Sequence, residues 1–173
     1  PLTPFRNGNF MGKIRTATNL DIESIRQLHL SAFTEEERKI ISTLAVALLN
    51  EHTNPGTLSL VAEVGGEVVG HVAFSPVTID SDKTWSGYIL APLAVSPDHQ
   101  KSGIGSKLVR QGIEQLSKQG VNVLFVYGDP DYYGRFGFDA AGANLYSPPY
   151  ELQYPFGWQA LMLKPCSLPR TAV

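Results

Sequence analysis

Short apolar runs separated by turn residues predict a set of strands along this chain. The runs 57–64 and 67–79 are joined at Gly65-Gly66, a pair typical of a tight hairpin. The run 121–128 is made of β-branched and aromatic residues, as in a buried strand. The predicted strands cover residues 13–18, 57–64, 67–79, 87–95, 121–128 and 158–164.

Helical spacing of apolar positions predicts two helices in the first third of the chain. Thr18 stands at an N-cap position with Asp21 three residues later, and apolar residues follow at helical spacing from Ile22. A second helix is expected over 35–49. Its apolar stripe consists of Ile40, Leu44 and Leu48.

The clearest helix is predicted over 104–119, where one stripe is formed by Ile104, Leu108, Gly112 and Leu116. Gly120 suits a C-terminal cap of this helix. Because the helix connects the apolar strands 87–95 and 121–128, we expect those two strands to be parallel neighbours in one sheet. A short helix turning straight into another strand is expected at 129–138.

This order of elements predicts one α/β domain of the α+β kind over residues 13–173. Its hairpins favour a mostly antiparallel sheet, unlike a doubly wound fold. Residues 1–12 carry no periodic pattern and are expected to be an extension, vector-derived or disordered.

The composition narrows the class of protein. The chain has 173 residues, of which 43% are hydrophobic and 17% charged, as in a globular domain. Its net charge of −2 lacks the basic excess of a nucleic-acid-binding protein. No apolar run approaches the ~20 residues that cross a bilayer. We therefore expect a cytoplasmic protein without a nucleic-acid partner or a membrane.

Metal and thiol chemistry find no support in the sequence. The only cysteine, Cys166, excludes an internal disulfide and lacks a partner histidine in any identifiable motif. His29, His52 and His99 lack metal-ligand spacing with one another. No metal site is expected.

The stretch HQKSGIGSKLV, residues 99–109, places Gly103 and Gly105 at the start of the predicted helix 104–119. Glycine there costs backbone entropy unless something must approach the bare backbone closely. The first-turn N–H groups of a helix have no partner inside the helix and favour an anion. The loop therefore indicates an anion site, with an ordinary glycine-rich turn as the simpler interpretation.

The stretch 99–109 does not match either of two known nucleotide-binding sequence patterns. A P-loop needs a glycine at position 100, where the chain has Gln100. A dinucleotide-binding fingerprint needs a glycine at position 108, which is Leu108. What remains is a Gln-x-x-Gly-x-Gly pattern between a strand and a helix.

In its context, this pattern resembles a known signature. PLAVSPDHQKSGIGSKLV is similar to the acyl-CoA-binding signature of the GNAT superfamily of N-acetyltransferases, and DPDYYGRFGF resembles that family's tyrosine-bearing helix. Order and spacing agree from about Lys13 to Lys164. The resemblance is greatest to the bacterial branch of acetyltransferases with unknown substrate. It implies a mixed, mostly antiparallel sheet flanked by helices, in which strands 87–95 and 121–128 splay apart.

The resemblance implies a site for acetyl-CoA as co-substrate. Its phosphates would meet the loop 100–106, where Lys101 adds a charge and Ser102 a hydroxyl, and its pantetheine arm would pair with the strand end 93–95. The three strand-end side chains are themselves expected to belong to the core. The implied contacts are Leu93, Ala94, Val95, Gln100, Lys101, Ser102, Gly103, Ile104, Gly105 and Ser106.

The same resemblance implies direct transfer of the acetyl group to a primary amine. Tyr133, placed five residues before Phe138, corresponds to the family's general acid, and its neighbour Tyr132 is the weaker candidate. A backbone N–H near Val95 is implied as the oxyanion donor. For any tyrosine chosen without its motif, core packing is the better interpretation.

The general base is where the sequence departs from the better-understood members. Many of those carry a glutamate on or near the fourth strand, whereas residues 84–95 contain no acid. Glu37 is the preferred candidate, although a solvated, acidic helix start explains Glu35, Glu36 and Glu37 more simply. His71 fits a buried core histidine better than a base, and a water chain is a further alternative.

Two functions of different classes remain open. An N-acetyltransferase is favoured by Tyr133, while a non-catalytic acyl-CoA-binding sensor or partner-binding module of the same fold is favoured by the missing acid. The expected acceptor is a small-molecule or protein amine, and self-association into a homodimer is left open.

Overall fold

A computed structural model describes residues 12–79, 84–149 and 151–163. The predicted extension at 1–12 therefore lies outside the described residues apart from Gly12, and so does Cys166. None of the helices within these ranges has the length and apolar character needed to cross a membrane.

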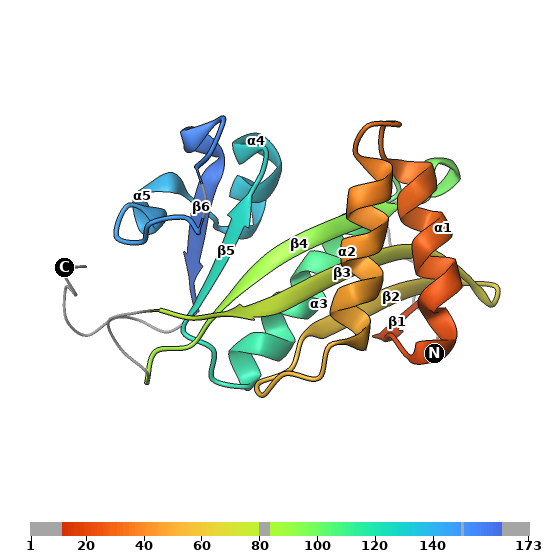
Figure 1. The fold of residues 1–173 in the computed structure, drawn as a ribbon, viewed down its shortest axis with the longest axis horizontal. Coiled ribbons are helices and arrows are strands. Elements are labelled where there is room, and N and C mark those ends of the chain that lie inside the picture. Colours follow the sequence, from red (N-terminus) through yellow and green to blue (C-terminus); the bar gives the residue numbers. More distant parts are fainter. Residues whose placement is uncertain (1–11, 80–83, 150, 164–173) are drawn as a thin grey trace. The chain divides into compact units, whose positions relative to one another are not determined.

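Within the described residues, six strands form one sheet in the order of the chain (Figure 1). β1 pairs with β2, β2 with β3 and β5 with β6 in antiparallel fashion, while β4 and β5 are parallel. This confirms the predicted mostly antiparallel sheet and its one parallel crossover. The strands are β1 (Lys13–Thr16), β2 (Leu58–Val64), β3 (Glu67–Val77), β4 (Gly87–Val95), β5 (Val123–Tyr127) and β6 (Trp158–Met162).

The longer helices agree with the predicted ones, and two short helices follow β5. Gly120, with φ of +83°, ends the third helix as expected. The helices are α1 (Ile22–Ala32), α2 (Arg38–Asn50), α3 (Ile104–Lys118), α4 (Pro130–Tyr133) and α5 (Ala140–Ala143).

The described chain divides into two compact units. The first holds the residues up to Ser75 together with Ala91–Gly112, and the second holds Pro76–Leu90 together with the residues from Ile113 on. The single domain expected over 13–173 stays a prediction.

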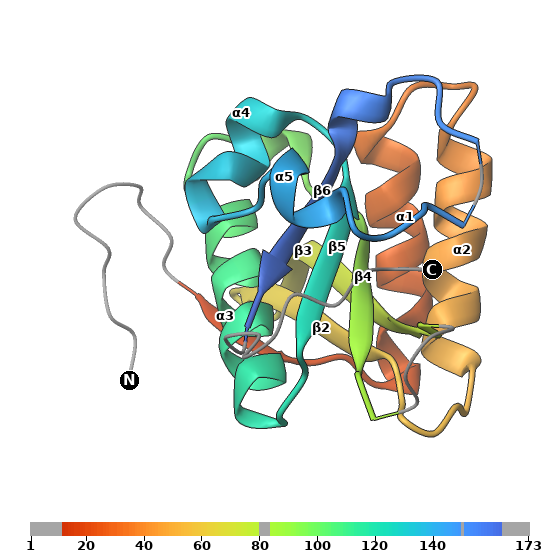
Figure 2. The ribbon, with the colours of Figure 1, turned by 90° about the vertical axis from the view of Figure 1, so that its left-hand side faces the viewer.

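In the first unit, helices cover both faces of β1–β3. Figure 2 shows α1 and α2 on one face and the beginning of α3 on the other. On the α1/α2 face, Ile25 and Ala45 pack with Val61 in a buried cluster. The structure explains why the α3 stripe contains Gly112: any side chain at this position would collide with the ring of Phe74 on β3.

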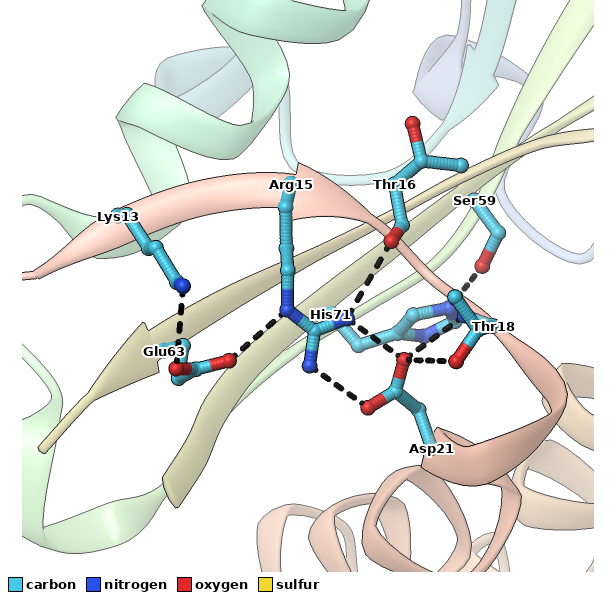
Figure 3. A network of polar contacts seen from close by, with 8 residues as sticks. All are labelled: Lys13, Arg15, Thr16, Thr18, Asp21, Ser59, Glu63 and His71. Carbon is cyan, nitrogen blue, oxygen red and sulfur yellow. Dashed lines mark hydrogen bonds and ion pairs between the residues drawn. The ribbon is translucent and has the colours of Figure 1, made fainter. Parts of the chain in front are cut away.

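The connection from β1 to α1 is held by a charged network (Figure 3). Thr18 is an N-cap residue as predicted and donates its N–H to the Asp21 carboxylate at 2.8 Å, but it caps a 3-10 turn, Asn19–Asp21, before α1 begins. Arg15 donates to both carboxylate oxygens of Asp21 at 2.8 Å and to Glu63 at 2.8 Å. These bonds fix where the chain leaves the sheet.

The apolar stripe predicted on α2 faces solvent over much of its length. Ile40 is 73% exposed and Leu44 is 42% exposed, whereas Ser42 and Ala45 are buried. The helix therefore packs through small residues, which lets it lie close to α1.

In the second unit, aromatic residues of β5 and β6 form the core. Phe125 stacks on Trp158, and the Trp158 Nε1 donates to the carbonyl of Tyr146 at 3.0 Å. The prediction of a strand at the end of 129–138 is wrong. Asp139 makes only an isolated bridge to Ala160, because its side chain accepts from Gly142 N and caps α5, which the sequence did not predict.

Candidate active site

The loop between β4 and α3 has an unusual backbone. After a 3-10 turn, Pro97–His99, Lys101 takes a left-handed φ of +62° and Gly103 a φ of +84°. A residue with a Cβ rarely adopts this conformation, because the backbone strain costs about 1 kcal/mol or more. Residues with such strain are found mostly at functional sites. The left-handed Gly103 gives a physical reason for the first glycine of the pattern.

Side chains of the loop tie it to its own backbone. The Gln100 Nε2 donates to the carbonyl of Val95 at 3.1 Å, and the Ser102 hydroxyl donates to the carbonyl of His99. Ser102 therefore already uses its hydrogen inside the loop. Gln100 has a structural role here, since it links the end of β4 to the turn.

Helix α3 begins directly after Gly103, and its first-turn amides include those of Ile104, Gly105 and Ser106. The amides that begin a helix carry partial positive charge, which favours an anion nearby. The Ile104 side chain is 2% exposed and is buried in the core, so only its backbone can serve a ligand.

The end of β4 runs past its pairing with β5. The parallel register extends from Gly87↔Val123 to Leu90↔Val126, whereas β4 continues to Val95. Ala94 is buried and Leu93 and Val95 are half-buried, as expected for core side chains.

Tyr133 lies in the second unit at the end of α4. Asp129 caps this helix by accepting from Asp131 N, and Tyr133 N donates to the Asp129 carbonyl at 3.0 Å. The Tyr133 ring covers Gly128 so closely that a Cβ there would come within 2.5 Å of its Cε2 atom. Sequence reasoning missed this use of Gly128.

Aromatic neighbours surround Tyr133 and change its chemistry. Its ring meets those of Tyr132 and Phe138 edge-on, with centroids 5.0 and 6.0 Å away. Burial, assisted by Tyr132, raises the pKa of Tyr133 well above its usual value, so the phenol keeps its proton at neutral pH. Tyr132 differs, because the Arg135 guanidinium lies 4.4 Å over its ring.

The acidic stretch before α2 is exposed. Glu37 occupies the N-cap position of α2 and accepts from the Thr34 hydroxyl at 3.0 Å, and Glu35 pairs with Arg38 at 3.1 Å. These local bonds agree with a solvated helix start. The role of Glu37 as a base stays a prediction.

His71 lies in a buried polar chain that the sequence did not reveal. Its Nδ1 lies 2.8 Å from His29 Nε2 on α1, and its Nε2 lies 2.7 Å from the Ser59 hydroxyl on β2. Burial lowers the pKa of His71 to about 3 and that of His29 to about 4, so both rings are neutral at pH 7. The core interpretation of His71 is confirmed. One feature of the sequence could have indicated this chain: His29 follows the apolar Ile25 by four residues, which places both on the same face of the helix.

Within the described ranges, His, Cys, Asp and Glu side chains nowhere gather in threes that could hold a metal ion.

Comparisons with known proteins agree with this geometry. An acetyltransferase (GNAT) domain family matches residues 13–141. The chain is 35% identical to YjhQ, an uncharacterized N-acetyltransferase of Escherichia coli K12, over 86% of this chain and 83% of the relative. A GNAT family acetyltransferase from Brucella melitensis, crystallised with acetyl-CoA, is 34% identical, with a TM-score of 0.67 and 94% of each chain covered. YhbS from Escherichia coli, crystallised with CoA, is 28% identical, with a TM-score of 0.73 over 94% of this chain and 85% of that chain. The chain belongs to the GNAT family of acetyltransferases.

Proposed function

We propose that this protein transfers the acetyl group of acetyl-CoA directly to a primary amine. The observation that carries the proposal is the loop before α3, with its left-handed Lys101 and Gly103. The solved relatives with bound acetyl-CoA and CoA support the choice of coenzyme. A cytoplasmic location is part of the proposal, since a single cysteine is ordinary for a reducing compartment.

The loop 100–106 would hold the phosphates of the coenzyme. First-turn amides of α3 supply donors, Gly103 and Gly105 leave room for phosphate oxygens, and the exposed Lys101 adds a positive charge. Gln100 and Ser102 would contribute by holding the loop rather than by touching the ligand, because both already bond to backbone carbonyls.

The pantetheine arm would lie along Leu93, Ala94 and Val95. The parallel pairing of β4 with β5 ends at Leu90, and on the side where that pairing has ended the strand offers backbone groups that an amide-rich ligand can satisfy. A backbone N–H near Val95 would then face the oxyanion of the tetrahedral intermediate.

The reaction needs two proton transfers. A neutral amine nitrogen attacks the thioester carbonyl carbon, and the resulting intermediate breaks its carbon–sulfur bond. We assign Tyr133 as the acid that gives its proton to the leaving thiolate, which its raised pKa and its place in the motif support. Glu37 is proposed as the base that accepts the amine proton, directly or through water.

The absence of acidic residues from β4 favours a second candidate, an acyl-CoA-binding module without catalysis. One experiment separates the two functions. The protein is incubated with acetyl-CoA and a panel of small amines, amino acids, aminoglycosides and peptides, and free thiol is followed. Amine-dependent thiol release supports the transferase. Binding of acetyl-CoA with no release across the panel supports the module, and no binding at millimolar coenzyme contradicts both.

A further inference from the structure

A row of positive charge on α3 follows directly from the coenzyme loop, within the first unit. Gly103, Lys107 and Arg110 are spaced by four and three residues, so they lie on one face of the helix. The Lys107 N–H donates to the Gly103 carbonyl at 3.1 Å, which starts the row at the loop itself. Ile104 and Leu108 are buried, whereas Lys107 is half-buried and Arg110 is exposed. The row therefore lies on the outer face of α3.

This placement of charge works against the helix. The start of a helix carries partial positive charge and disfavours cations. Lys107 nevertheless lies in the first turn of α3 and Lys101 just before it, and no acidic residue occurs between Asp98 and Glu114. An anion bound beside this end of the helix would remove the conflict.

The two cations of the row also disfavour each other. Burial, together with the charge of Arg110, lowers the pKa of Lys107 below its usual range. The protonated lysine is therefore less stable here than in water, and a neighbouring anion would stabilise it. This observation concerns side chains and is independent of the backbone of the loop.

The position of the row selects one phosphate of the coenzyme. CoA carries a pyrophosphate and, on the adjacent ribose, a 3′-phosphate. The pyrophosphate takes the amides at the end of the helix in the function proposed above. Lys107 and Arg110 stand beside the helix, ~6 and ~10 Å along its axis from Gly103, and their Cα–Cβ bonds tilt back toward the loop. A phosphate one sugar away from the pyrophosphate fits this position.

We propose that Lys107 and Arg110 recognise the 3′-phosphate of the coenzyme and make it a requirement for tight binding. A guanidinium can bind two phosphate oxygens at once, and an ammonium adds a point charge. The proposal rests on the coenzyme site proposed above and defines which acyl donors that site accepts. CoA thioesters are favoured over acyl groups carried on phosphopantetheine, which lacks the 3′-phosphate.

The probes are CoA and 3′-dephospho-CoA, which differ in this one phosphate. Each is titrated calorimetrically into the protein at low ionic strength and without an amine. Dephospho-CoA should bind the wild type about tenfold more weakly, because it lacks the charge-assisted hydrogen bonds of the phosphate. The difference should shrink at high salt, since the row is close to solvent.

Substitutions in the row test the assignment. Lys107→Met keeps the aliphatic stem and a good helix former. It should weaken CoA about fivefold and dephospho-CoA by less than about twofold, so that the two Kd values approach each other. Arg110→Gln should act in the same direction, and Lys107→Arg should keep the preference for CoA. Melting temperatures check that the variants fold.

Lys118→Met is the matched control. It removes a cation of the same helix that is paired with Glu114 at 2.8 Å, far from the loop. The ratio of the two Kd values should stay that of the wild type.

The proposal is overturned if CoA and dephospho-CoA bind the wild type within about twofold of each other. It is also overturned if Lys107→Met and Arg110→Gln weaken both compounds equally, since these side chains would then serve the pyrophosphate. An equal change of the ratio in Lys118→Met would assign the preference to net charge and overturn it as well. If neither compound binds at millimolar concentration, the coenzyme site itself is contradicted, and this inference with it.

Discussion

At the scale of single residues, Tyr133 has a chemical state that suits a general acid. Its ring is enclosed by aromatic neighbours and by the bare backbone of Gly128, so the phenolate is poorly solvated. The raised pKa follows from that environment. Tyr132, one residue earlier, instead stacks with the Arg135 guanidinium.

Tyr133→Phe should lower turnover by at least ~10²-fold, because a positioned acid contributes typically 10²–10⁴-fold to the rate. The ring and its packing remain, so the Kd for acetyl-CoA should change by less than about threefold. Steady-state thiol release with an active amine gives the first quantity, and calorimetric titration gives the second.

Tyr132→Phe is the matched control and should retain most of the activity. Equal and small losses in both variants would remove Tyr133 as the acid.

At the scale of elements, the β4–α3 loop combines backbone strain with a helix start. The left-handed Lys101 is the one described non-glycine residue with a positive φ. Strain of this kind persists where surrounding structure imposes it, and here the bonds from Gln100 and Ser102 do so. The loop is thus held in shape before any ligand arrives.

Gly103→Glu should abolish the rise in melting temperature that acetyl-CoA causes by mass action. A carboxylate at this position would repel the phosphates, and any Cβ would crowd them. Differential scanning fluorimetry with and without millimolar coenzyme measures the effect.

Gly65→Glu is the control for backbone strain. Gly65 also has a positive φ, of +57°, but lies in the β2–β3 turn with no atom within 4 Å of an added Cβ. This variant should lose similar stability and keep the full coenzyme-dependent shift. A shift lost in both variants would show that strain, not charge, is responsible.

Lys101→Gly separates strain from charge in the same loop. Relief of the left-handed strain should leave the free energy of unfolding unchanged or raise it by up to about 1 kcal/mol, partly offset by the entropy of glycine. Loss of the ammonium should weaken acetyl-CoA binding about fivefold at low salt and less at high salt. Urea denaturation and titrations at two ionic strengths test both parts, and a large loss of stability would contradict the strain argument.

At the scale of the whole molecule, the buried chain Ser59–His71–His29 joins β2, β3 and α1. Both histidines are fully buried and neutral, and their folded pKa values lie below the ordinary 6.5. The unfolded chain therefore binds more protons than the folded one at mildly acidic pH. The stability that these two neutral histidines contribute is fully present above pH 6.5 and is lost as the pH falls toward about 4 for His29 and about 3 for His71.

Between pH 6 and pH 5, the free energy of unfolding should fall with a slope approaching two protons, about 1.4 kcal/mol per pH unit for each histidine. His29→Gln can still bond to His71, and it should reduce the slope to about one proton. Urea unfolding at a series of pH values measures the slope, and a flat profile in the wild type would contradict the prediction.

Asp21 makes the free energy of unfolding depend on pH in a second, more acidic range. The bonds from Arg15 hold the pKa of Asp21 at about 2, below its usual 3.8. Its contribution, about 1–2 kcal/mol because Arg15 is partly solvated, is lost only as the pH falls below 3.8 toward 2. Asp21→Asn should therefore lower stability at pH 7 without changing the slope above pH 5.

The sequence alone determined the features that depend on local patterns. The N-cap of Thr18 and the stripe and C-terminal glycine of α3 follow from spacing within one element, and the crossover between β4 and β5 follows from the order of strand, helix and strand. Strand ends were placed less well: β1, β3 and β5 end before the predicted stretches 13–18, 67–79 and 121–128 do. The glycine loop could be identified because its chemistry lies in one stretch of chain.

Tertiary structure decided whatever joins distant parts of the chain. The partner of His71 is 42 residues away, and no periodicity specifies which buried polar groups will meet. The exposure of Ile40 and Leu44 depends on α1, which contacts the small side of α2. Asp139 became a helix cap instead of a strand residue through its bond to Gly142, while its backbone met Ala160. Sequence spacing sets local geometry, but burial and pairing are set by which surfaces come together.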